Sequence, residues 1–357
     1  MANLPDKINT WQMTEPGKLV KTTIPVPELK PGEALVKVSG CGVCHTDLGY
    51  FYDGVPTVNK PPLTLGHEIS GVVVAGDAKW VGKEVIVPAV MPDNTCPICA
   101  AGRNNRCLSQ KMPGNSMGIY GGFSDYIPVP SADLCLVEGR GSMLLESLAV
   151  VADAVTSPYQ AAKRANLKPG DNVIIVGATG GLGSFATQVC SAMGAKEVIA
   201  IARNPEKLKR SLEYGATHTI SSQGKDNKAI RDEFRTYCKG KNLPSNFGWK
   251  IFEWSGTADG QQIALELLSF IGVLVICGFG TQKNEYSLSR LMAFDADIVG
   301  SWGCLPKYYP EVMRLVTANK IKIQPFIETR PMSQIQEVFE AAHKGGLPKR
   351  VILTPDF

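Results

Sequence analysis

The stretch NVIIVGATGGLG, residues 172–183, decides the fold of the second half of this chain. Its first five residues are rich in β-branched side chains and predict a buried strand, and a helical pattern follows the loop. A glycine-rich loop between a strand and a helix is the setting in which such loops bind a dinucleotide. We therefore expect cofactor contacts at Gly180, Gly181, Leu182 and Gly183. The alternative is a tight packing turn without a ligand.

Strand-like and helix-like segments alternate around this loop. Expected strands lie at 172–176, 197–201, 250–253, 273–277 and 297–300, and expected helices lie at 158–165, 183–193 and 205–214. Alternation with short loops predicts a parallel sheet flanked by helices, which is the doubly wound Rossmann arrangement of an α/β protein.

Residues 1–150 have a different pattern. Short β-prone runs, for example at 34–38, 69–74 and 84–87, are broken by Gly and Pro and predict an irregular, mostly antiparallel β region. A last helix near 333–343 and a strand at 350–353 are expected to return to this first domain. For a chain of 357 residues we expect two domains, 1–153 with 302–357, and 154–301.

Composition argues against several classes of partner. The net charge is +4, from 37 Lys and Arg and 33 Asp and Glu, and no dense basic block occurs, so nucleic acid is not expected. Charged residues make up 20% and hydrophobic residues 44%, which is typical of soluble globular proteins. No apolar run reaches the roughly 20 residues that span a bilayer, and the first residues lack a signal-peptide core. We expect a cytoplasmic protein with no membrane partner.

Two segments carry good zinc ligands. Cys44 offers a thiolate and His67 an imidazole, and Asp47 and Glu68 are nearby carboxylates suited to supporting such ligands. Two ligands do not close a tetrahedral site. A site that needs a third ligand and leaves its fourth position open is the catalytic kind. The residues alone leave the third ligand open.

The ten cysteines include a second cluster. Cys96, Cys99 and Cys107 have a spacing typical of a metal site. In a reducing compartment, cysteines are expected to be metal ligands or buried thiols and not disulfides. Six further cysteines stand singly and are expected to be structural: Cys41, Cys135, Cys190, Cys238, Cys277 and Cys304.

The strand at 197–201 is followed by Ala202 and Arg203, where NAD-dependent enzymes usually have an acidic residue that binds the ribose hydroxyls. Without that carboxylate a 2′-phosphate is not repelled, and Arg203 could attract it. This pattern favours NADP. Alternatively, Arg203 stacks on the adenine and does not discriminate between the two cofactors.

In chain order, the motifs resemble those of the zinc-dependent medium-chain alcohol dehydrogenases over essentially the whole chain. They are CGVCHTD at 41–47, GHE at 66–68, the cysteine cluster, the glycine loop and RVILT at 350–354. Further stretches resemble one subgroup of that family, which oxidises 6-hydroxycyclohex-1-ene-1-carbonyl-CoA with NAD in anaerobic aromatic (benzoyl-CoA) degradation. These stretches lie at 41–50, 65–71, 110–115, 150–156, 248–253 and 291–294.

The resemblance implies a GroES-like β domain beside the Rossmann domain, NAD as the cofactor with NADP open, and two zinc ions per chain. The catalytic zinc would be held by Cys44, His67 and Asp153. The family's structural zinc uses four cysteines, and here the implied ligands are Asp93, Cys96, Cys99 and Cys107. A carboxylate thus replaces the first cysteine, which still permits a closed zinc site.

The resemblance also implies roles around the catalytic zinc. Thr46 would take the proton of the substrate alcohol, Asp47 would orient an imidazole, and Glu68 would support or transiently replace a ligand. Many relatives continue the proton path through a histidine where this chain has Gly49. The relay therefore either ends in water, passes through the cofactor ribose or uses another group.

Three more contacts follow from the resemblance. His45 and Arg350 would face the cofactor pyrophosphate, and Ser157 would contact the nicotinamide. The family analogy also implies a homo-dimer or homo-tetramer joined through the nucleotide-domain sheets.

The expected function is hydride transfer from the secondary allylic alcohol of the cyclic acyl-CoA to NAD, which gives the 6-oxo enone. A generic NAD(P)-dependent alcohol or polyol dehydrogenase is the alternative. A second alternative is an NAD(P)H-dependent enone or enoyl reductase, although such relatives commonly lack the metal ligands. A non-catalytic zinc-binding module is a different class, and the open three-ligand site argues against it.

Overall fold

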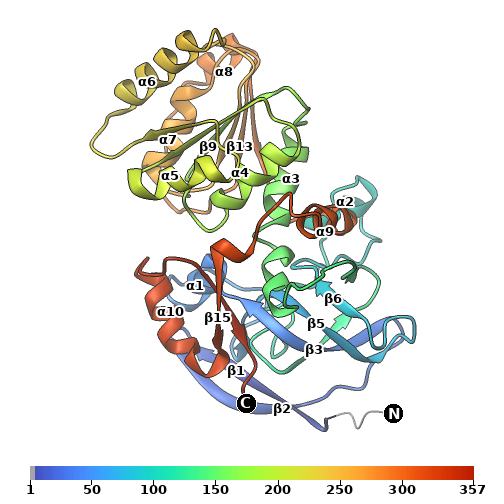
Figure 1. Cartoon of the computed structure of the whole chain (residues 1–357). Helices are drawn as coiled ribbons and strands as arrows, with labels where there is room; N and C mark the ends of the chain where they lie inside the picture. Colours follow the sequence, from blue (N-terminus) through green and yellow to red (C-terminus); the bar gives the residue numbers. More distant parts are fainter. Residues whose placement is uncertain (1–4) are drawn as a thin grey trace. The chain divides into compact units, whose positions relative to one another are not determined.

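The computed structural model describes residues 5–357, which divide into two compact units (Figure 1). The first unit contains the residues up to Thr156 together with Gly303–Asn319 and Ile323–Phe357. The second contains Ser157–Trp302 and Lys320–Lys322. Each unit has its own sheet structure and is described by itself.

The first unit is built on mostly antiparallel β structure, as predicted. A small sheet has the order β2-β1-β4, with β1 at Lys7–Glu15, β2 at Lys18–Pro25 and β4 at Leu63–Thr64. A larger sheet has the order β15-β16-β3-β5-β6-β8, and β7 also pairs with β3. Its strands are β3 Glu33–Gly42, β5 Glu68–Gly76, β6 Glu84–Val87, β7 Tyr126–Pro130, β8 Cys135–Leu136, β15 Ile327–Pro331 and β16 Arg350–Thr354.

Short helices connect these strands. They are α1 His45–Phe51, α2 Pro97–Ala100 and α9 Tyr309–Thr317, with 3-10 turns at Asn104–Arg106, Glu146–Ala152 (η2), Pro306–Tyr308 and Gln324–Phe326.

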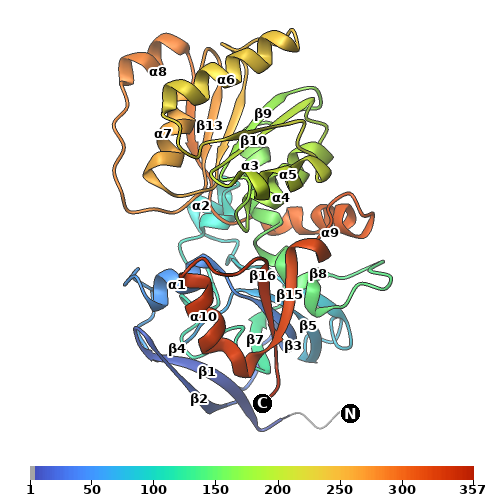
Figure 2. The ribbon, with the colours of Figure 1, turned by 60° about the vertical axis from the view of Figure 1, so that its left-hand side comes forward.

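The C-terminal segment returns to the first unit, as predicted. β16 pairs with β15 in parallel and with β3 in antiparallel register, where Ile352 lies opposite Gly42. In Figure 2, α10 (Ile335–His343) lies beside β15 and close to α1. α10 begins two residues after the predicted start near 333, because Met332–Gln334 form a 3-10 turn that leads into it.

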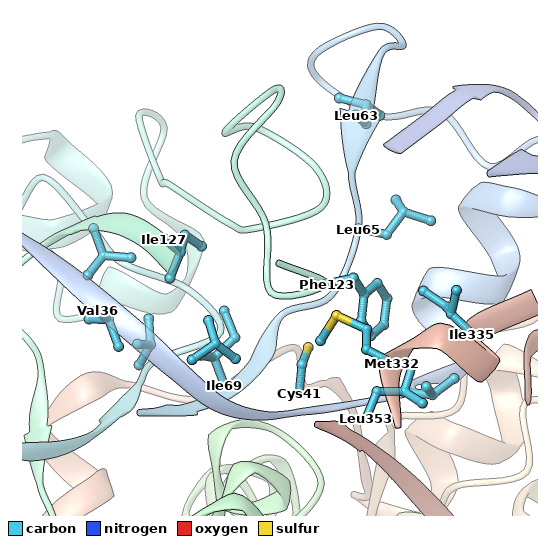
Figure 3. Packing of buried hydrophobic residues seen from close by; sticks show 14 of the residues in the cluster. Val36, Cys41, Leu63, Leu65, Ile69, Phe123, Ile127, Met332, Ile335 and Leu353 are labelled. Atoms are coloured by element: carbon cyan, nitrogen blue, oxygen red, sulfur yellow. The ribbon is translucent and has the colours of Figure 1, made fainter. Parts of the chain in front are cut away.

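A hydrophobic cluster joins β3, β5 and α10 (Figure 3). Its fully buried members include Val36, Ile69, Phe123, Ile335 and Leu353. The sulfur of Cys41 packs against Gly66, where an added Cβ atom would lie only 2.7 Å from it. Gly66 also has a φ of +92°, a conformation that glycine adopts without strain. This packing fixes the backbone next to His67.

The second unit contains a parallel sheet with the order β11-β10-β9-β12-β13-β14. Counted along the chain this is the strand order 3-2-1-4-5-6 of the doubly wound Rossmann fold, so the predicted fold class is confirmed. The strands are β9 Asn172–Val176, β10 Glu197–Ala202, β11 His218–Ser221, β12 Lys250–Glu253, β13 Val273–Ile276 and β14 Asp297–Gly300.

Helices flank this sheet (Figures 1 and 2). They are α3 Thr156–Arg164, α4 Gly183–Ala192, α5 Pro205–Glu213, α6 Asn227–Gly240, α7 Ala258–Leu267 and α8 Leu288–Phe294. α3 begins before the predicted start at 158, because Pro158 fits the first turn of a helix, where its missing N–H is not needed.

The six cysteines expected to be structural are free thiols, and all are buried except Cys277, which is partly exposed. Across residues 5–357, no helix combines the length and the apolar character needed to cross a membrane.

Candidate functional site

A buried carboxylate organises the start of α1. Cys44 is the N-cap of this helix, and its N–H donates to Oδ2 of Asp47 at 3.1 Å. The other oxygen, Oδ1, accepts from the Gly66 N–H at 3.0 Å and lies 3.3 Å from Nδ1 of His67. Asp47 therefore connects α1 to the segment before β5. Because Nδ1 of His67 faces Asp47, Nε2 is the imidazole nitrogen left for a ligand.

Metal-binding atoms converge beside this carboxylate. The ligand atoms of Cys44, His67, Glu68 and Asp153 all lie within 4.8 Å of one another. Sγ of Cys44 and Nε2 of His67 each lie 3.8 Å from Oδ2 of Asp153. Cys44 and His67 are only 3% and 2% exposed. A thiolate, an imidazole and a carboxylate are ligands that Zn²⁺ prefers, so this donor set fits zinc.

Asp153 is the residue that ends the η2 turn. The turn is fixed by the buried hydroxyl of Tyr309, which donates to the carbonyl of Ala152 at 2.5 Å and accepts from the N–H of Ala89 at 3.1 Å. A carboxylate from the end of one turn thus meets ligands from two other segments.

Glu68, the fourth member of the cluster, forms an ion pair with Arg350. The guanidinium donates to both carboxylate oxygens of Glu68, with Nε 2.9 Å from Oε2. The Arg350 side chain is 7% exposed and the Glu68 side chain is 0% exposed. Glu68 is the first residue of β5 and Arg350 is the first residue of β16. Both of these strands pair with β3. With Glu68 held in this way, three donors face the space that a metal ion would fill.

The cluster is electrostatically suited to positive charge. Burial alone would lower the pKa of the His67 imidazole, but Asp47, Asp153 and Cys44 outweigh burial and raise it well above its usual range. Burial also opposes the charge of Arg350, yet the Glu68 carboxylate keeps the pKa of Arg350 above its usual value. Surroundings that stabilise extra positive charge suit a divalent cation.

A second group of ligand atoms lies around α2. The ligand atoms of Asp93, Cys96, Cys99 and Cys107 lie within 4.8 Å of one another. Oδ1 of Asp93 is 3.1 Å from Sγ of Cys107 and 3.7 Å from Sγ of Cys99, and Sγ of Cys96 is 3.5 Å from Sγ of Cys99. Three sulfurs and a carboxylate complete a tetrahedral zinc donor set.

Backbone N–H groups favour the charged forms of two members of this group, Cys96 and Asp93. The Leu108 N–H lies 3.5 Å from Sγ of Cys96 and, with other backbone donors, lowers the pKa of Cys96 to about 7. The Thr95 N–H and the Cys107 thiol lower the pKa of Asp93 to about 2. Desolvation raises the pKa of Cys99 to about 12. A thiol crowded by two other sulfurs loses its proton most readily when a metal ion shares the site.

The glycine loop of the second unit follows β9, which lies between β10 and β12. The strand order reverses at this point, and doubly wound sheets bind ligands at such switch points. Gly180 and Gly181 are exposed, whereas Gly183 is buried at the start of α4. A Cβ atom on Gly183 would lie 2.1 Å from the carbonyl oxygen of Gly177, so only glycine permits this packing.

Four further predicted cofactor residues also lie in the second unit or at its edge. Leu182 is the N-cap of α4, and Ser157 is buried in α3. Ala202 is buried at the end of β10, and Arg203 is exposed directly after it.

The remaining predicted residues lie on α1. His45 is exposed, whereas Thr46 is half-buried with Oγ1 3.7 Å from Sγ of Cys44. A Cβ atom on Gly49 would lie 3.3 Å from Val55, which is closer than ordinary packing allows. The position at which many relatives carry a histidine is therefore tightly packed here.

Two contacts of this site were not predicted from the sequence. Arg350 was expected at a pyrophosphate, and its pairing with Glu68 joins residues 282 positions apart. The hydrogen bond from Tyr309 to Ala152 at the end of η2 also joins residues far apart in the sequence, 157 positions. The only sequence signal for either is a polar residue within an apolar strand or helix pattern.

Comparisons with known proteins fit this geometry. Residues 30–139 match the alcohol dehydrogenase GroES-like domain, and residues 181–318 match the zinc-binding dehydrogenase family. An alcohol dehydrogenase of Geobacillus stearothermophilus is 30% identical over 333 residues, covering 92% of this chain and 93% of that protein. The chain belongs to the zinc-dependent medium-chain alcohol dehydrogenases.

Other relatives agree with this assignment. A sorbitol dehydrogenase of Bombyx mori is 26% identical and covers 92% of this chain and 93% of its own length. The crystal structure of the alcohol dehydrogenase of Aeropyrum pernix has a TM-score of 0.82 at 26% identity, covering 97% of this chain and 100% of that one. This member of the family is an oxidoreductase of CH–OH donors that uses zinc and NAD(P).

Zinc content is expected to separate the two ligand clusters. Wild-type protein should carry two zinc ions per chain, and Cys44→Ser and Cys107→Ser should each lose one, because each removes a thiolate from a different donor set. Elemental analysis after gel filtration measures this. Cys190→Ala, which removes a buried free thiol outside both clusters, is the control. Two retained zinc ions in Cys107→Ser would contradict a metal site at the second cluster.

Arg350→Met is expected to lower the free energy of unfolding by about 3–5 kcal/mol, because it leaves Glu68 buried without its partner. The double variant Glu68→Gln/Arg350→Met should recover most of this loss. Arg140→Met is the matched control, since its pair with Glu84 is about one-third exposed, at 31% and 33%, and should cost about 1 kcal/mol or less. Urea denaturation followed by circular dichroism measures all three. Equal losses in Arg350→Met and Arg140→Met would disprove the special role of the buried pair.

Proposed function

We propose that this chain oxidises a secondary alcohol at a zinc ion held by Cys44, His67 and Asp153, with NAD as the hydride acceptor. The observation that supports this is the convergence of these three donors while Glu68 is occupied by Arg350. Three protein ligands leave a fourth coordination position for the substrate oxygen, as in other catalytic zinc sites.

The chain's own residues would prepare the substrate. Asp47 would orient His67, and Thr46, whose hydroxyl lies next to Cys44, would accept the alcohol proton. Zinc bound here would stabilise negative charge on the alcohol oxygen, while the nicotinamide would accept hydride. Since Gly49 is packed against Val55, the next acceptor after Thr46 is water, the cofactor ribose or another side chain.

We also propose where the dinucleotide cofactor and a second, structural zinc ion bind. The loop at Gly180–Gly183 would bind the pyrophosphate, and Ala202 and Arg203 leave NADP open beside NAD. Contacts of the cofactor with His45, Ser157 and Arg350 stay predictions. Asp93, Cys96, Cys99 and Cys107 would hold a structural zinc, which stabilises the segment around α2 and takes no part in chemistry.

For the substrate, we propose 6-hydroxycyclohex-1-ene-1-carbonyl-CoA, oxidised to the 6-oxo enone in aromatic degradation. The support for this acyl-CoA is the sequence resemblance over the stretches between 41 and 294. A generic alcohol or polyol dehydrogenase is the second candidate, because relatives bear the names sorbitol dehydrogenase, D-xylulose reductase and L-galactonate-5-dehydrogenase. The complete ligand set argues against an enone or enoyl reductase.

A second copy of the chain is the expected partner. β14 is an edge of the parallel sheet, and α8, which precedes it in the chain, exposes Leu288 and Met292 at 77% and 75%. An exposed edge strand with apolar neighbours is suited to pairing with a second copy. Light scattering should give the mass of two or four chains, and Met292→Glu should reduce it. A wild-type monomer would contradict this part of the proposal.

The substrate assignment is tested by nicotinamide reduction. The hydroxy-acyl-CoA, cyclohexanol and sorbitol are each supplied with NAD and with NADP. We expect turnover of the thioester with NAD, and loss of turnover by at least about a hundredfold in Asp153→Asn, because a neutral amide is a poor zinc ligand. Turnover of the simple alcohols without the thioester would reject the acyl-CoA and leave the generic dehydrogenase. Faster reaction with NADP would assign Arg203 to the 2′-phosphate.

A further inference from the structure

A buried carboxyl group lies at the switch point of the parallel sheet in the second unit. Glu253 is the last residue of β12 and is 0% exposed. In the sheet it lies between Val176, which ends β9, and Ile276, which ends β13. The strand order reverses between β9 and β12, and a doubly wound sheet binds its ligand in the crevice at the carboxyl ends of such strands.

The hydrogen bonds of Glu253 are all made with the turn that follows β12. Its carboxylate accepts from the N–H groups of Ser255, at 2.7 Å, and Gly256, at 3.2 Å, and also from the Ser255 hydroxyl. Among residues 5–357, no lysine, arginine or histidine pairs with it, and burial raises the pKa of Glu253. Burying a carboxylate without a cation is costly, so what this side chain contributes is the conformation of the turn at 254–256.

This turn is in backbone contact with two other loops. On one side, a Cβ atom on Gly177, the residue that follows β9, would lie 2.7 Å from the N atom of Ser255. On the other side, a Cβ atom on Gly278, which follows β13, would lie 2.2 Å from the N atom of Gly256. Side chains are therefore excluded at both contacts, and the loops after β9, β12 and β13 depend on one another's position.

The same carboxylate is connected to the start of α7. The Ser255 hydroxyl, which donates to Glu253, lies 3.0 Å from Oγ1 of Thr257. Thr257 is the N-cap of α7, and its Oγ1 accepts from the Gly260 N–H at 3.1 Å. Strand, turn and helix start are thus ordered together around Glu253.

The two halves of a Rossmann sheet each bind one half of a dinucleotide. Here β9–β11 follow and flank the glycine loop, which is expected to receive the pyrophosphate next to the adenine half, so β12–β14 are left for the nicotinamide half. We propose that Glu253 is a positioning residue for the nicotinamide half of the cofactor. It holds the turn at 254–256 between the glycine loop and the loop after β13, and this sets the shape of the crevice. The inference deepens the proposed function, because it rests on dinucleotide binding at Gly180–Gly183.

The test compares a whole dinucleotide with ADP, which has the adenine, one ribose and both phosphates but no nicotinamide. In Glu253→Gln, the dissociation constant of the better bound of NADH and NADPH should rise about tenfold, because the amide NH₂ group faces the N–H donors of the turn. The dissociation constant of ADP should stay within about twofold of the wild-type value. Fluorescence titration measures the reduced cofactor, and calorimetry measures ADP.

The same sheet offers a matched control. Glu197 is the first residue of β10, and its carboxylate also accepts hydrogen bonds from side chains, the hydroxyls of Thr217 and Tyr237. Because it lies at the amino end of its strand, away from the carboxyl ends that form the crevice, Glu197→Gln should leave both dissociation constants unchanged. Ser255→Ala, which keeps the N–H donor and removes the hydroxyl, should weaken dinucleotide binding about threefold without weakening ADP.

Two results would overturn the inference. Equal weakening of dinucleotide and ADP in Glu253→Gln would mean that the carboxyl group only stabilises the fold, and an unchanged dissociation constant for the dinucleotide would mean that it does not position the cofactor. If Glu253→Gln does not fold, Ser255→Ala decides by the same comparison. Failure of the proposed function looks different: wild-type protein that binds the dinucleotide but oxidises no alcohol would reject alcohol oxidation, while the binding comparison would still decide the role of Glu253.

Discussion

The site depends on one buried carboxylate, that of Asp47. A fully buried charge is tolerated only where hydrogen bonds replace its hydration, and here the Cys44 N–H, the Gly66 N–H and the His67 ring supply them. Those three groups belong to the two segments that carry Cys44 and His67, the first two of the proposed zinc ligands. Satisfying one charge therefore positions both residues and leaves Nε2 of His67 facing Asp153.

The chain must close on itself to complete this arrangement. Glu68 is adjacent to His67, and its charge is balanced by Arg350 from the last strand, which reaches the site only because β16 pairs with β3. The C-terminal segment is thus a structural part of the first unit and neutralises a carboxylate that would otherwise compete for the metal. In the order β16-β3-β5, the two charged residues begin the strands on either side of β3, next to its end at Gly42.

Features that depend on local patterns were predictable from the sequence. The strand, loop and helix at 172–192 follow from β-branched residues and glycines, and the spacing of Cys96, Cys99 and Cys107 pointed to one cluster. The third donor, Asp153, came from resemblance, since spacing alone says nothing about a residue so far along the chain. The pairs Glu68–Arg350 and Tyr309–Ala152 were beyond reach, because they depend on which segments become neighbours.

The two ligand clusters differ in a way that fits the different roles proposed for them. Asp93 and Cys107 are 14 residues apart, so the second cluster draws all its donors from one short segment and a metal there restrains that segment. The first cluster takes single donors from the start of α1, from the segment before β5 and from the end of η2, and hydrogen bonds of Asp47, Gly66 and Tyr309 hold these segments. Donors that are positioned by hydrogen bonds within the chain do not require a fourth protein ligand. They can therefore leave that position to a substrate oxygen, which is the condition for chemistry at the metal.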